Sequence, residues 1–231
     1  MNFEFNNFEL TARAVLFDMD GVLFDSMPNH AYAWSHAMTQ FGLEMTAYEA
    51  YLHEGRTGSG TINILTQRYW RRDATEEEIE RIYAAKAEVF NTLPEPKPMP
   101  GAFEALTAAK ELGCKIVLVT GSAQASLLER LEEHYSGFFH EDLMVTGFDV
   151  KYGKPHPEPY LIGLQKADVK AEEAIVVENA PLGVESAKGA GIFTIAANTG
   201  PLEDRILKDA GADIVVSGMM EVSCLLRTLE R

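Results

Sequence analysis

The sequence predicts an α/β protein: a parallel sheet with helices on both faces, and a small all-helical segment inserted after the first strand. Two observations lead to this prediction. From Gly101 onward, short runs rich in Val and Ile alternate with helical patterns, which is typical of parallel sheets covered by helices. Between the first apolar run, residues 14–16, and Gly101, the apolar residues follow helical spacing only.

The bulk composition narrows the classes of partner. The 231 residues are enough for one large domain with an insert. A formal net charge of −15 argues against a nucleic-acid partner and against an anionic membrane. The N-terminus lacks the apolar core of a signal peptide, and no run approaches the ~18 apolar residues of a membrane-spanning helix. The two cysteines, Cys114 and Cys224, lack metal-like spacing, so we expect a reduced, cytoplasmic protein. We also expect a monomer.

Two carboxylates leave the carboxyl end of the first expected strand. They are Asp18 and Asp20 in the stretch Phe-Asp-Met-Asp-Gly-Val-Leu-Phe-Asp, residues 17–25. Open parallel sheets bind ligands at this end of their strands, and Gly21 lets the chain turn tightly behind the second acid. Two acids this close repel each other unless they share a cation or a proton, which points to Mg²⁺. The alternative is a strand that ends in solvated acids.

The next part of the chain, residues 26–93, is expected to be helical. The candidate helices are residues 29–40, 61–70 and 75–91. Thr75 is a good N-cap because three glutamates follow it. Residues 53–60 form a Gly-rich loop, and four prolines make residues 94–100 a stiff linker. We therefore expect two domains, a core of residues 1–26 and 95–231 and a helical cap of residues 27–94.

After the linker, helices and short strands alternate. The expected helices are residues 102–112, 125–134, 157–167, 182–190 and 220–229. The expected strands are residues 115–120, 143–145, 174–177, 193–196 and 213–216. Strands this short, each separated from the next by a helix, indicate a parallel sheet.

Polar residues follow the carboxyl end of the second strand. Thr120, Gly121 and Ser122 offer a hydroxyl and free N–H groups where a helix opens, which suits an anion. We take Gly121 and Ser122 as substrate-binding candidates. The alternative is that Ser122 only caps the helix.

Two further strand ends carry candidate residues. After the third strand, Lys154 is followed by Pro155, which stiffens the chain beside the ammonium group. The fourth strand ends in Glu178 and Asn179, which offer oxygen ligands. Alone, each has a plain alternative: a surface lysine, or a solvated acid with a turn-forming amide. Polar groups of these types at four successive strand ends favour an active site.

These motifs, in this order, strongly resemble those of the haloacid dehalogenase superfamily of phosphotransferases over nearly the whole chain. The matching stretches are Phe-Asp-Met-Asp-Gly-Val at residues 17–22, Val-Thr-Gly-Ser at 119–122, Gly-Lys-Pro at 153–155 and Glu-Asn at 178–179. The resemblance implies a Rossmannoid sheet with a helical cap, as in the subfamily of β-phosphoglucomutase and phosphoglycolate phosphatase. Residues 53–57 and 178–183 look most like a branch that includes an inorganic pyrophosphatase, often labelled β-phosphoglucomutase.

The resemblance also implies roles for the core residues. Asp18 would attack phosphorus and form an aspartyl-phosphate. Asp20 would protonate the leaving oxygen and then activate water. Thr120, Gly121 and Lys154 would hold the phosphoryl oxygens.

The implied cofactor is Mg²⁺, which would neutralise charge on the transferred group. Its ligands would be the Asp18 carboxylate, the backbone carbonyl of Asp20, and either Glu178 or Asn179. Many relatives carry Glu-Asp in this fourth motif, whereas this chain has Glu-Asn. The sequence leaves open which of the two is the direct ligand.

Cap residues are expected to select the substrate. Arg56 matches an arginine that grips the distal phosphate, a task that suits a bidentate guanidinium. Lys86 matches a second cap cation, with a solvated helix lysine as the alternative. His30 matches a hinge histidine that faces the site, with a packing histidine as the alternative. Trp34 is expected in the cap core, although an active-site wall is the competing interpretation.

Glu54 is unexpected beside a phosphate-binding arginine, because a carboxylate repels the substrate. It is tolerable if it pairs with Arg56, reaches Mg²⁺, or lies on the far side of the loop. The first two favour a small anion over a sugar phosphate. We therefore predict a phosphohydrolase acting on a small phosphorylated metabolite or pyrophosphate. The alternative is a β-phosphoglucomutase that interconverts β-glucose 1-phosphate and glucose 6-phosphate.

Overall fold

The computed structural model describes residues 11–121 and 127–229. Six parallel strands form one sheet in the order β3-β2-β1-β4-β5-β6, which confirms the predicted α/β class. The strands are β1 (Ala14–Phe17), β2 (Lys115–Val119), β3 (Met144–Val145), β4 (Ala174–Glu178), β5 (Phe193–Ala197) and β6 (Ile214–Val216).

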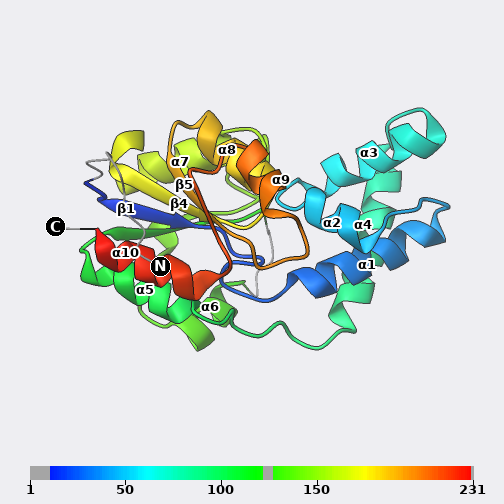
Figure 1. Cartoon of the computed structure of the whole chain (residues 1–231). Coiled ribbons are helices and arrows are strands. Elements are labelled where there is room, and N and C mark those ends of the chain that lie inside the picture. Colours follow the sequence, from blue (N-terminus) through cyan, green and yellow to red (C-terminus); the bar gives the residue numbers. More distant parts are fainter. Residues whose placement is uncertain (1–10, 122–126, 230–231) are drawn as a thin grey trace.

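Helices cover both faces of this sheet, with α5, α6 and α10 below it and α7, α8 and α9 above it in Figure 1. They are α5 (Ala102–Glu111), α6 (Leu127–Tyr135), α7 (Glu158–Ala167), α8 (Pro181–Gly189), α9 (Asp204–Asp209) and α10 (Met219–Thr228), with 3₁₀ turns at Glu141–Leu143 and Ala171–Glu173. Alternate residues of β1 enter the two apolar layers: Val15 and Phe17 face one, Ala14 and Leu16 the other. This alternation follows from the two-residue period of a strand.

The segment after β1 is helical and has a core of its own. Its helices are α1 (Met27–Gln40), α2 (Ala47–Leu52), α3 (Gly58–Trp70) and α4 (Glu76–Asn91). Their buried apolar side chains form a cluster separate from those of the sheet, and Figure 1 shows the four helices to one side of the sheet. Thr75 caps α4 as predicted, and Thr57 caps α3. The latter cap starts α3 within the loop that we expected to extend to residue 60.

Two short helices are absent from the sequence prediction, α2 and α9. Each has six residues, which is less than two helical turns and too short to show a periodic apolar pattern. A capping box between Thr46 and Glu49 marks the start of α2.

Two connections join the helical segment to the sheet, and they lie side by side. The backbone N–H of Asp25 donates to Lys97 O at 2.9 Å, and the N–H of Met99 donates to Leu23 O at 2.8 Å. Paired in this way, the two connections bring the helices over the carboxyl end of β1. Within the described residues, no helix is long and apolar enough to cross a membrane.

Candidate active site

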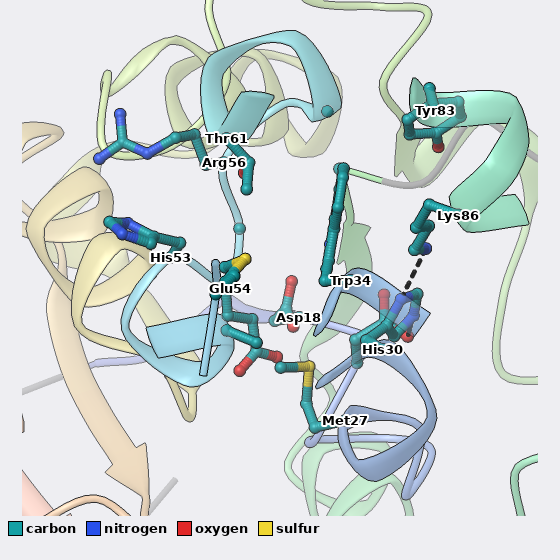
Figure 2. Close-up of a pocket in the computed structure, with 16 residues that line it drawn as sticks. Asp18, Met27, His30, Trp34, His53, Glu54, Arg56, Thr61, Tyr83 and Lys86 are labelled. Atoms are coloured by element: carbon teal, nitrogen blue, oxygen red, sulfur yellow. Dashed lines mark hydrogen bonds and ion pairs between the residues drawn. The ribbon is translucent and has the colours of Figure 1, made fainter. Parts of the chain in front are cut away.

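A small pocket lies where the helical segment meets the carboxyl ends of the strands. Its volume is about 100 Å³. Residues of both parts line it, namely Asp18, Asp20 and Gly121 from the sheet and His30, Trp34, Glu54, Arg56 and Lys86 from the helices (Figure 2). The structure therefore brings together most of the residues predicted for the site. Ser122, also predicted, lies outside the described residues.

Lys154 is the centre of a buried charge cluster at the sheet edge. Its Nζ donates to Asp18 Oδ1 at 2.5 Å, to Glu178 Oε1 at 2.6 Å and to Val119 O at 3.2 Å. All three charged side chains are buried, so Lys154 is not a surface lysine. Burial alone would lower the pKa of Lys154, but the Asp18 and Glu178 carboxylates outweigh it and raise this pKa.

For Asp18, in contrast, burial has a larger effect on the pKa than the neighbouring Lys154 charge. Burial raises the pKa of Asp18 to about 7, with a smaller contribution from the Glu178 and Asp20 carboxylates, although Lys154 opposes the shift. The site thus holds more negative charge than its nearest cation neutralises. A further cation beside Asp18 would restore the carboxylate to its ionised form.

Asp20 belongs to a second cluster that runs into the helical segment. Ser26 Oγ donates to Asp20 Oδ1 at 2.5 Å, and His30 Nε2 lies 3.3 Å from the same oxygen. His30 Nδ1 lies 2.9 Å from Lys86 Nζ, and Figure 2 marks this contact. Burial opposes ionisation of Asp20, yet His30, Ser26 and Lys86 together hold its pKa well below the usual range. These contacts therefore favour the ionised form of Asp20.

Lys86 is buried rather than solvated, which rules out the plain alternative for this residue. Its Nζ lies 4.8 Å from the centre of the Phe90 ring and 5.5 Å from that of Trp34. Burial lowers the pKa of Lys86 to about 8, and Asp20 only partly offsets this effect. Trp34 both lines the pocket and packs against the helical core, so the two interpretations of this residue are compatible.

Glu54 reaches across to the sheet edge. Asn179 Nδ2 donates to both carboxylate oxygens of Glu54 at 3.2 Å. This contact rules out a position on the far side of the loop, and the described residues contain no ion pair between Glu54 and Arg56. Burial, followed by the charges of Asp18 and Asp20, raises the pKa of Glu54 well above its usual value.

Gly21 makes room for this contact. Its φ is +80°, and a Cβ atom there would lie 2.0 Å from Asn179 Nδ2. Both the backbone conformation and the close approach therefore require glycine. This is a stricter demand than the tight turn that the sequence indicated.

Arg56 lies at the rim of the pocket but does not face Asp18. Figure 2 shows its guanidinium group directed away from Asp18. Its Nε is buried and has no hydrogen-bond partner among the described residues. The structure therefore does not bring Arg56 together with the sheet-edge cluster.

The donor set at the fourth motif distinguishes the two metal-ligand candidates. Glu178 Oε1 accepts from Lys154 and from Tyr160, and Oε2 accepts from the backbone N–H groups of Asn179 and Ala180. In contrast, Asn179 Oδ1 is buried and has no partner among the described residues. The free oxygen therefore belongs to Asn179.

These residues fit a divalent cation held by few protein ligands. The carboxylates of Asp20 and Glu178 raise the pKa of Asp18, and those of Asp18 and Asp20 raise that of Glu54, whereas Lys154 contacts only Asp18 and Glu178 among these groups. In the described part of the chain, no three His, Cys, Asp or Glu side chains are arranged to hold a metal. Mg²⁺ needs no such group, because it binds through one or two carboxylates and keeps water and substrate oxygens as its other ligands.

Two contributors were absent from the sequence prediction, Ser26 and Tyr160. Ser26 follows the first motif closely and bonds to Asp20, so its hydroxyl was an available signal. Tyr160 lies on α7 among apolar residues, and a helical aromatic residue in such a pattern indicates only a core position.

Comparisons with known proteins agree with the α/β fold. The family model of haloacid dehalogenase-like hydrolases matches residues 12–191. The phosphorylated carbohydrates phosphatase of Thermotoga maritima is 36% identical, over 88% of this chain and 93% of that protein. Hexitol phosphatase A of Escherichia coli is 29% identical, over 93% of this chain and 94% of that protein. A Bacteroides vulgatus structure provisionally named as β-phosphoglucomutase is 52% identical, with a TM-score of 0.90 over 95% of this chain and 91% of that one.

Proposed function

Because the chain belongs to the haloacid dehalogenase-like hydrolase family, we propose that it is a Mg²⁺-dependent phosphohydrolase that acts on a small phosphate, with pyrophosphate as the substrate. The observation that carries this proposal is the buried Glu54 carboxylate in a small pocket. Burial and the charges of Asp18 and Asp20 disfavour the ionised form of Glu54, so this carboxylate is best matched by a substrate that brings its own cation. Pyrophosphate binds Mg²⁺ and is small, so it meets both conditions.

In the proposed reaction, Asp18 attacks phosphorus and forms an aspartyl-phosphate, which water then hydrolyses. Lys154 holds Asp18 at 2.5 Å and supplies positive charge where the phosphoryl oxygens gather. Thr120 and Gly121 lie at the end of β2 beside it. Their polar groups complete a preorganised cradle for the transferred group.

Asp20 would carry the proton in both steps, first to the leaving oxygen and then from the attacking water. Ser26 and His30 hold its carboxylate oxygen at 2.5 and 3.3 Å. The contacts that lower the pKa of Asp20 disfavour its protonated form, so a leaving group that needs little protonation suits this residue. A leaving phosphate is such a group, because it is a far weaker base than a sugar alkoxide, and this supports a pyrophosphate substrate.

The Mg²⁺ ion would be held by the Asp18 carboxylate, the Asp20 backbone carbonyl and Asn179 Oδ1. When bound, it neutralises negative charge on the phosphoryl group. The free Asn179 oxygen and the saturated carboxylate of Glu178 support this choice between the two candidates.

We also propose that residues 27–94 act as a cap that closes on the core, residues 1–26 and 95–231. The separate apolar clusters support this division. The paired connections near Leu23 and Met99 would serve as the hinge. Closure would exclude bulk water during the first step.

The second candidate is an enzyme for sugar phosphates, as a phosphatase or as a β-phosphoglucomutase. The names of the compared relatives favour it, since two are phosphatases of carbohydrate or hexitol phosphates and one carries the mutase name. Both candidates use Asp18 as the nucleophile and Asp20 for proton transfer. They differ in what the cap admits.

A steady-state screen tests the proposal. The substrates are pyrophosphate, a panel of sugar phosphates, and β-glucose 1-phosphate with a bisphosphate primer, each with Mg²⁺ and with excess chelator. We expect the highest kcat/KM for pyrophosphate and no turnover in chelator. A higher kcat/KM for a sugar phosphate, or conversion of β-glucose 1-phosphate to glucose 6-phosphate, would favour the second candidate instead.

A further inference from the structure

We infer that Tyr160 is a positioning residue that acts through Glu178 and Lys154 on Asp18; this rests on the proposed role of Asp18 as nucleophile. Tyr160 lies on α7 and its side chain is fully buried. Its hydroxyl donates to Glu178 Oε1 at 2.6 Å. Tyr160 does not line the pocket, so any effect on the reaction must pass through its neighbours.

The neighbour that receives this effect is Lys154. Its Nζ donates to the same oxygen, Glu178 Oε1, also at 2.6 Å. The ammonium has three N–H groups and three acceptors within 3.2 Å, which are Glu178, Asp18 and the carbonyl of Val119. Lys154 is therefore shared between two carboxylates, and the strength of one contact depends on the other.

The Tyr160 hydroxyl affects how Lys154 is shared, because it donates a second hydrogen bond to the Glu178 oxygen that accepts from Lys154. In a buried site, a carboxylate oxygen that loses one donor attracts its remaining donor more strongly. Without the hydroxyl, Glu178 would draw the ammonium of Lys154 toward itself and away from Asp18. The nucleophile would then lose part of the positive charge that orients it.

Glu178 cannot relieve the loss by moving. Its other oxygen, Oε2, accepts from Asn179 N at 3.1 Å and from Ala180 N at 3.4 Å. The first turn of α8 packs directly against the carboxylate, since a Cβ atom on Gly183 would lie 2.0 Å from Oε1. Because the Glu178 carboxylate is held on both sides, we expect Lys154 to move instead when the Tyr160 hydroxyl is removed.

The test is Tyr160→Phe, which keeps the ring and removes only the hydroxyl. We expect the rate of the first phosphoryl transfer, measured as p-nitrophenol release from p-nitrophenyl phosphate in a single turnover, to fall about tenfold. KM is expected to change less than about twofold, because Tyr160 does not touch substrate. In the substrate-free protein, the ¹⁵Nζ signal of Lys154, assigned by its loss in Lys154→Arg, is expected to shift.

Thr194→Val is the matched control. Thr194 is also buried, and its hydroxyl donates to a backbone carbonyl, that of Ile192, outside the pocket. We expect this variant to lower the unfolding midpoint by a similar amount and to leave the Lys154 signal in place. An equal loss of rate in both variants would reduce Tyr160 to a packing role.

The two measurements separate this inference from the proposed function. If Tyr160→Phe leaves the Lys154 signal unmoved, or moves it without slowing the first transfer, the inference is wrong. If the wild-type protein cleaves no phosphate compound, the proposed function fails. The Lys154 signal then decides by itself whether Tyr160 positions that ammonium.

Discussion

The sheet edge and the helical segment both place charged groups at the candidate active site, and they hold these groups differently. At the sheet edge, Asp18, Lys154 and Glu178 are joined by hydrogen bonds of 2.5 and 2.6 Å and are almost fully buried. The groups from the helices make longer or indirect contacts. Glu54 meets Asn179 at 3.2 Å, and Lys86 reaches Asp20 only through His30.

The difference follows from the fold. Parallel strands have their carboxyl ends at the same edge of the sheet. The cluster of Asp18, Lys154 and Glu178 is therefore positioned when the sheet forms. The helical groups enter the pocket only because two short connections carry their helices over it. The sheet edge is therefore suited to the chemical step, and the helical segment is suited to selecting what enters.

The largest expected effect tests the sheet edge. Asp18→Asn should abolish turnover and leave the fold intact, because it removes the attacking carboxylate while its shape is kept. We expect kcat to fall below about one hundredth of the wild-type value, with an unchanged circular dichroism spectrum. Arg56→Ala, in the helical segment, should retain measurable turnover. Activity above that limit in Asp18→Asn would remove Asp18 as the nucleophile.

A pair of lysine variants compares the two regions directly by stability. Lys154→Met leaves two buried carboxylates facing each other, and we expect a loss of about 3–5 kcal/mol in the free energy of unfolding. Lys86→Met keeps the apolar stem among the aromatic rings. It loses the His30 contact and the charge near Asp20, but it also removes an ammonium group whose burial is unfavourable, so we expect a net loss of no more than roughly 1 kcal/mol. Urea unfolding of both variants measures the difference. Equal losses would contradict the distinction between the regions.

Glu54→Ala tests selection by the helical segment. Removing the carboxylate should relax selectivity, so the ratio of kcat/KM for pyrophosphate to that for a sugar phosphate should fall. A discrimination of about 1–3 kcal/mol corresponds to roughly 5- to 150-fold in this ratio. Glu80→Ala is a suitable control, because Glu80 is an exposed glutamate on the helix α4 of the same segment and does not line the pocket. An unchanged ratio for Glu54→Ala would withdraw the main support for pyrophosphate.

The smallest expected effect concerns the pH dependence of Lys86. Burial lowers its pKa to about 8, below the value of about 10.4 in an unfolded chain. Between these values the unfolded state binds more protons at this site, so stability rises with pH. From about pH 8 to about pH 9.5, the wild type should gain about 1–2 kcal/mol over Lys86→Met. If the free energies of unfolding of the two proteins changed by the same amount over this pH range, Lys86 would instead be solvated.

The sequence by itself determined the parallel sheet and the groups at its edge. Alternation of apolar runs and helices is a local property, and the topology of a parallel sheet then gathers Asp18, Lys154 and Glu178 at one end. The pattern also indicated three of the four cap helices. It did not indicate α2 and α9, because six residues carry no measurable period.

Only the tertiary structure decided how the predicted groups are used. The saturated oxygens of Glu178, the free Oδ1 of Asn179 and the outward direction of Arg56 all depend on distances between elements far apart in the chain. The same holds for the contact between Glu54 and Asn179, which are separated by 125 positions. Motifs specify which side chains reach a site, whereas hydrogen bonding and burial, which only folding creates, specify which atoms remain free to act.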